Sequence, residues 1–224
     1  MTKLFRKIAS LYQLSLQISN NNGDIHNGSD ILIANHSQLS LHQLGNYVGS
    51  HLIRDPRDAI VSGYFYHLWT NEAWAQEPQE IYGGQSYQQH LKGLSQENGL
   101  VAEIERFKTY IRDYKLMEWD YQNPRIYEVK YETLIADEQR VFEKMFRHFG
   151  FHETAIRKCL KLAKTVSFAS VAKRDPGQTK TGSHLRSGRP NQWVDVLNDQ
   201  HRELIKSLWG DLIIRMGYEV NNDW

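Results

Sequence analysis

Short apolar runs alternate with segments of helical periodicity along this chain, and this alternation restricts the fold more than any other feature. Three segments are predicted strands, because each is short, largely apolar and bounded by turn residues: Ile31 to Ala34, Tyr47 to Ile53 and Arg125 to Tyr131. Helical segments lie between them, so we expect the strands to pair in parallel through right-handed crossovers. The sequence therefore predicts an α/β fold with three layers, α/β/α, around a parallel central sheet.

Several segments have the spacing of amphipathic helices. The first covers residues 2 to 18 and places Leu4, Ile8, Leu11 and Tyr12 on one face. The others are predicted near residues 56–69, 86–94, 101–114, 138–149, 153–163 and 198–217. Asp137 and Gly150 are the expected start and stop signals of the helix between them.

A charged turn, Arg54-Asp55-Pro56-Arg57-Asp58, joins a predicted strand to a predicted helix. Asp55 suits the N-cap, Pro56 suits the first helical position, and Asp58 is spaced to complete a capping box. The first N–H groups of a helix lack partners within it, so Arg54 and Ser62 are expected to point at a phosphate bound here. From spacing alone, a well-capped and solvated corner is the alternative.

The charge balance limits the partners that the whole surface attracts. Lys and Arg number 27 and Asp and Glu number 26, which argues against nucleic acid as a partner and makes any anion site local. A chain of 224 residues with 40% hydrophobic content predicts one domain over residues 1–224. Cys159 is the only cysteine, and we find neither a secretion signal nor an apolar run long enough to span a membrane, so a cytoplasmic location is expected.

The run from Arg54 to Ser62 resembles a motif of the sulfotransferases that use 3′-phosphoadenosine 5′-phosphosulfate (PAPS). In that family an arginine and a serine eight positions later hold the 3′-phosphate, and the spacing here is the same. The segment from Tyr127 to Leu134 resembles the family's strand ending in Tyr-Glu-Asp, which implies that Tyr131 lies near the adenine. Arg186-Ser187-Gly188, followed by Trp193, is similar to the family's late loop, which implies a second contact to the 3′-phosphate.

Ala34-Asn35-His36 lies where the family has Lys-Thr-His, so the resemblance implies that His36 is the catalytic base. It also implies a P-loop NTPase-like fold, PAPS as the sulfuryl donor, no metal, and a small-molecule or glycan acceptor that offers a hydroxyl or an amine. Two points stay open. Tyr131 is alternatively a core aromatic at a strand end. The aromatic residues of the loop at 71–84 and its flank either line an acceptor pocket or pack the loop; they are Trp69, Trp74 and Tyr82.

The family's Lys-x-Gly-Thr-x-Trp loop, which binds the 5′-phosphosulfate after the first strand, has no counterpart in this sequence. The helix expected from Met1 to about Ile18 resembles the one that follows that loop, so the resemblance implies a fold that lacks its first strand and an N-terminally incomplete domain. Two functions stay open: a PAPS-dependent sulfotransferase, truncated or wrongly started, and a non-catalytic remnant that binds a nucleotide 3′-phosphate. A P-loop kinase is a third alternative that needs the same missing loop.

Overall fold

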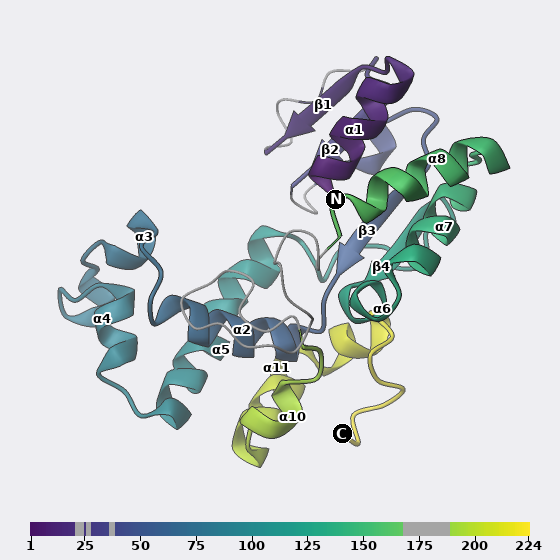
Figure 1. Ribbon diagram of the computed structural model, residues 1–224. Coiled ribbons are helices and arrows are strands. Elements are labelled where there is room, and N and C mark those ends of the chain that lie inside the picture. The colour runs from purple at the N-terminus through teal and green to yellow at the C-terminus, as the bar shows by residue number, and fades with distance from the viewer. Residues whose placement is uncertain (21–24, 26–27, 36–38, 168–188) are drawn as a thin grey trace. The chain divides into compact units, whose positions relative to one another are not determined.

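The structure is a computed structural model, and it describes residues 1–20, 25, 28–35, 39–167 and 189–224 (Figure 1). The chain divides into two compact units. Unit 1 contains residues 1–53 and 113–175, and unit 2 contains residues 54–112 and 176–224. The single sulfotransferase-like domain over residues 1–224 stays a prediction.

All strands of the described residues belong to unit 1. β1 (Leu16–Ser19) pairs in parallel with β2 (Ile31–Ala34), and β3 (Gly49–Ile53) pairs in parallel with β4 (Ile126–Lys130). The register places Leu16 opposite Ile31 and Gly49 opposite Ile126. The predicted parallel pairing is confirmed. In the part of the chain that the structure describes, however, the strands form two separate pairs, whereas the sequence predicted one central sheet.

The N-terminal helix is shorter than predicted. α1 (Thr2–Tyr12) ends because Gln13 adopts a left-handed conformation, with φ 54° and ψ 39°, and its N–H donates to Ala9. The prediction of one helix over residues 2 to 18 is therefore wrong beyond Tyr12, since the next residues form β1 and satisfy their hydrogen bonds by pairing with β2. Leu11 is 47% exposed, so it does not share the buried face of Leu4.

The helices of unit 1 pack on β4 and on α1. α6 (Tyr131–Ala136) follows β4 directly, and α7 (Glu138–His148) and α8 (Glu153–Lys164) complete the unit. Asp137 caps α7 by accepting from the Arg140 N–H, and Gly150 follows α7 with φ 78°, as predicted. One buried cluster forms the core of unit 1: Leu4, Ile8, Val129, Leu134, Val141, Phe142, Met145, Phe146, Ile156, Cys159 and Ala163.

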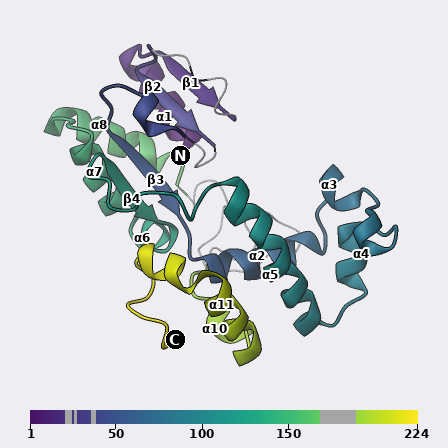
Figure 2. The same cartoon turned by 180° about the vertical axis from the view of Figure 1, so that it is seen from behind.

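Unit 2 is helical. Its elements are α2 (Pro56–His67), α3 (Ala73–Gln76), the short turn η3 (Glu80–Tyr82), α4 (Tyr87–Lys92), α5 (Gln96–Asp113), α10 (Trp193–Val196) and α11 (Asp199–Arg215). In both views α5 crosses α2 (Figures 1 and 2). They approach closely because Gly99 of α5 leaves room for the Tyr64 ring; a Cβ at Gly99 would lie 2.6 Å from that ring. No helix of the described residues is long and apolar enough to cross a membrane.

Candidate functional site

The N-terminus of α2 is built around the Asp55 carboxylate. Asp55 caps the helix by accepting from the Arg57 N–H at 2.9 Å, and Pro56 occupies the first helical position, as predicted. The predicted capping box is wrong. The Asp58 carboxylate instead accepts from the backbone N–H of Asn191 at 2.7 Å and of Trp193 at 3.0 Å. Asp58 therefore ties a segment that is distant in the sequence to the first turn of α2.

The backbone at this helix end has few N–H groups to offer an anion. Pro56 has none, and the N–H groups of Arg57 and Ala59 donate to the side chain and the carbonyl of Asp55. A phosphate bound here would depend on side chains more than on the helix N-terminus. The sequence predicted a larger role in anion binding for these backbone N–H groups than their geometry allows.

Arg54 and Ser62 are placed for such a role by the helix itself. Arg54 is half-buried and directly precedes the cap, and Ser62 is half-buried in the second turn of α2. Ser62 follows Asp58 by four residues, so the two side chains share one face of the helix. Since Asp58 binds Asn191 and Trp193, the chain that follows the Arg186-Ser187-Gly188 motif is attached to the face of α2 that carries Ser62.

The charges of this turn are strongly coupled. Burial raises the pKa of Asp58, and the N–H of Trp193 and then the positive charge of Arg54 offset part of that rise. Arg54 is therefore one of the charges that act on the Asp58 carboxylate.

A second arginine of the turn is buried and fully engaged. The Arg57 side chain donates from Nε to Asp55 Oδ1 at 2.9 Å, from Nη2 to Asp55 Oδ2 at 2.7 Å, and from Nη1 to Glu219 Oε1 at 2.5 Å. The sequence did not predict the structural roles of three residues of this site: Arg57, Asp58 and Glu219. A charged turn gives no sign in the sequence of being buried. The isolated Trp224 after a polar stretch was the one signal that the end of the chain packs back on the protein.

The other predicted site residues lie in unit 1 or outside the described residues. Tyr131 is half-buried at the first position of α6, directly after β4, and belongs to unit 1. Four residues lie outside the described residues: His36, Arg186, Ser187 and Gly188. Among the residues that the structure does describe, no group of three or more His, Cys, Asp or Glu side chains is placed to hold a metal.

The aromatic residues near the loop at 71–84 pack against helices of unit 2. The Trp74 Nε1 donates to Glu72, its ring centre lies 5.0 Å from that of His67, and the Arg106 guanidinium lies 3.8 Å from it. The Tyr82 ring is stacked on His90, with ring centres 4.6 Å apart. These contacts favour packing of the loop over an acceptor pocket as the role of Trp74 and Tyr82.

Comparison with known proteins gives the family. The sulfotransferase domain matches residues 51–217 of this chain. No curated protein matches the sequence. The solved structures that are similar to it include the following two. A mouse sulfotransferase, SULT7A1, complexed with PAP is 13% identical with a TM-score of 0.48, and the match covers 94% of this chain and 79% of that one. A retinol dehydratase in complex with androsterone and inactive cofactor PAP is 15% identical with a TM-score of 0.44, and the match covers 85% of this chain and 55% of that one. Because the family match spans most of the chain, from the last strand before the charged turn to the end of the last helix, this protein belongs to the sulfotransferase domain family.

Proposed function

We propose that this protein is a sulfotransferase that moves a sulfuryl group from PAPS to a hydroxyl or amine of a small molecule or glycan. The observation that carries the proposal is the turn at the start of α2, within the matched residues 51–217. Asp58, four positions after Arg54 and four before Ser62, binds the backbone N–H groups of Asn191 and Trp193 there. A 3′-phosphate distinguishes PAPS from most other adenine nucleotides, and a guanidinium with a hydroxyl is a donor set that suits it.

The charge of the turn requires a further cation for this role. The turn contains two guanidinium groups, of Arg54 and Arg57, and two carboxylates, of Asp55 and Asp58, and Glu219 adds a third carboxylate by pairing with Arg57. A dianionic phosphate would therefore not be neutralised by these residues alone. We assign the second cation to Arg186, with Ser187 and Gly188 beside it, and the adenine contact to Tyr131.

The transfer itself needs little covalent chemistry from the protein. The acceptor oxygen or nitrogen attacks sulfur, the bond between sulfur and the 5′-phosphate oxygen breaks, and adenosine 3′,5′-bisphosphate leaves. We assign the acceptor's proton to His36 as general base. A cytoplasmic location is part of the same proposal.

Calorimetry with adenosine 3′,5′-bisphosphate tests the binding half of the proposal. The wild-type protein should bind it more tightly than adenosine 5′-monophosphate, which lacks the 3′-phosphate. Arg54→Ala should lower the affinity for the bisphosphate about tenfold to a hundredfold, the loss of a charge-assisted hydrogen bond worth roughly 1.5 to 3 kcal/mol. Arg112→Ala, at an exposed position of α5, is the matched control and should bind like the wild type. Equal affinity of the wild type for the two nucleotides would refute the assignment of the turn.

A second candidate is a non-catalytic protein that retains the 3′-phosphate site. The turn that carries Arg54 and Ser62 would support such binding by itself, because a 3′-phosphate site does not need the groups that the transfer reaction requires. A transfer assay that follows the release of adenosine 3′,5′-bisphosphate from PAPS, over a panel of phenols, alcohols, amines and sugars, separates the two. Tight binding of the bisphosphate with no transfer to any acceptor would favour the second candidate.

A further inference from the structure

The role of Arg57 is not explained by ligand binding. Only 2% of Arg57 is exposed, and its guanidinium donates to Asp55 and to Glu219. The guanidinium carbon lies 3.8 Å from the ring centre of Trp193 and 4.4 Å from that of Trp224. Two carboxylates and two indole rings thus surround it, so it is not available to a bound nucleotide. Its function must be exerted through the residues that it holds.

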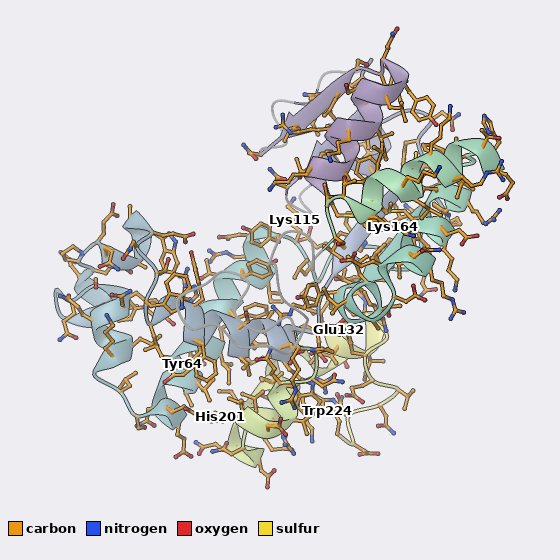
Figure 3. All side chains as sticks on the ribbon, viewed as in Figure 1. Tyr64, Lys115, Glu132, Lys164, His201 and Trp224 are labelled. Carbon is orange, nitrogen blue, oxygen red and sulfur yellow. The ribbon has the colours of Figure 1, made fainter. Side chains whose placement is uncertain are left out.

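Two of those residues, Glu219 and Trp224, come from the C-terminal tail, residues 218–224. The tail packs against α11 at Gly210, where there is no room for a side chain: a Cβ at Gly210 would lie 2.3 Å from Asn222 Oδ1. Trp209, next to it, departs from helical geometry with φ −142° and ψ 18°. The tail ends at Trp224, labelled in Figure 3, on the part of the chain that contains α10 and α11.

We propose that the C-terminal tail positions the phosphate-binding turn through Arg57, an inference that rests on the proposed function. Asp55 is both the N-cap of α2 and the residue directly after Arg54. The planar guanidinium of Arg57 fixes both oxygens of the Asp55 carboxylate. Glu219 and Trp224 in turn fix the plane of that guanidinium. The direction in which Arg54 leaves the turn is therefore set by a residue 162 positions beyond Arg57.

Loss of the tail contact should act on the site and not only on the fold. Without the Glu219 carboxylate, a buried guanidinium keeps one N–H without a charged partner and can turn away from Asp55. The Asp55 cap then loses its fixed orientation, and so does the side chain of Arg54, which directly precedes it. A purely structural role would lower the stability without changing which nucleotide the protein prefers.

The experiment measures that preference in the chain of 224 residues. Glu219→Gln retains the shape and an acceptor oxygen and removes the charge; Asp223→Asn, exposed in the same tail, is the matched control. Affinities for adenosine 3′,5′-bisphosphate and adenosine 5′-monophosphate are measured by calorimetry below the melting temperature of each variant. Glu219→Gln should lower the affinity for the bisphosphate about threefold to tenfold and leave the affinity for the monophosphate unchanged. Asp223→Asn should change neither affinity. If Glu219→Gln does not fold, Trp224→Leu at the end of the tail serves in its place, with the same expected change.

The outcomes separate the two proposals. A wild-type protein that does not distinguish the two nucleotides overturns the proposed function. A wild-type protein that distinguishes them, with the same affinity ratio in Glu219→Gln or its replacement, overturns the role of the tail alone. A loss of affinity for the bisphosphate alone in Glu219→Gln supports both proposals.

Discussion

Glu103 is a buried carboxylate, 3% exposed, that joins three helices of unit 2. Its Oε2 accepts from the Tyr87 hydroxyl at 2.7 Å and lies 2.8 Å from His67 Nδ1. Gly63 makes room for it, because a Cβ at that position would lie 2.6 Å from Glu103 Oε1. A charge at this depth is tolerated because it has two partners, and removing either one leaves it undersatisfied.

Tyr87→Phe should therefore lower the free energy of unfolding at neutral pH by about 1 to 3 kcal/mol. Burial, and then the negative charge of Glu103, raise the pKa of Tyr87. An unfolded tyrosine ionises near pH 10, so the unfolded state releases this proton first and the stability of the wild type falls as the pH rises beyond about 10. The difference between wild type and variant should shrink over that range. Urea denaturation at pH values near 7 and near 11 measures it, with Tyr110→Phe at a half-exposed position as control. A difference that stays constant with pH would contradict this account.

At the scale of elements, the Asp58 side chain joins α2 to the start of α10, because both of its carboxylate oxygens accept hydrogen bonds. Asp58 Oδ2 accepts from Asn191 and Oδ1 from Trp193, which lie 133 and 135 residues further along the chain. An amide in place of this carboxylate presents an NH₂ group to one of the two backbone donors. The attachment of the segment to α2 should then be lost.

We expect Asp58→Asn to accelerate hydrogen exchange at the backbone amides of Asn191 and Trp193. An acceleration of about tenfold to a hundredfold corresponds to roughly 1 to 3 kcal/mol for an unsatisfied buried donor. Exchange followed by NMR or mass spectrometry measures it, and Asp211→Asn, exposed on α11, should leave these amides unchanged. Unchanged protection in Asp58→Asn would mean that other contacts hold the segment.

At the scale of the whole molecule, the proposed site draws on residues far apart in the sequence. The two guanidinium groups of the turn are offset by two carboxylates of the turn and by Glu219, so the proposal includes a further cation, which we assign to the segment that precedes α10. Arg186→Ala should lower the affinity for adenosine 3′,5′-bisphosphate about tenfold to a hundredfold, as Arg54→Ala does. The matched control is Arg189→Ala, since Arg189 pairs with Asp195 at the surface and should not affect binding. Calorimetry that finds the larger loss in Arg189→Ala would show that the motif was assigned to the wrong arginine.

Much of the local structure of this protein was predictable from its sequence. The strand, cap and helix around Asp55, the strand at Ile31–Ala34, and the helix between Asp137 and Gly150 were predicted and are confirmed. The reason is physical: a cap, a proline at the first helical position and the period of the apolar residues act within one or two turns. The same locality allowed the three ordered motifs to indicate the family, which the match over residues 51–217 confirms.

The order of residues along the chain is enough to indicate where elements begin, which residue types make up the charged turn and to which family the chain belongs. Three features depend on contacts made in the folded chain: residues 16–19 form a strand, Asp58 binds Asn191 and Trp193, and Arg57 is buried between Asp55 and Glu219. A strand forms only when a second strand supplies its hydrogen-bond partners, and an isolated segment has none. A charged side chain is equally compatible with water and with a buried ion pair until its partner is in place. Those choices are made by groups that approach only when the chain has folded.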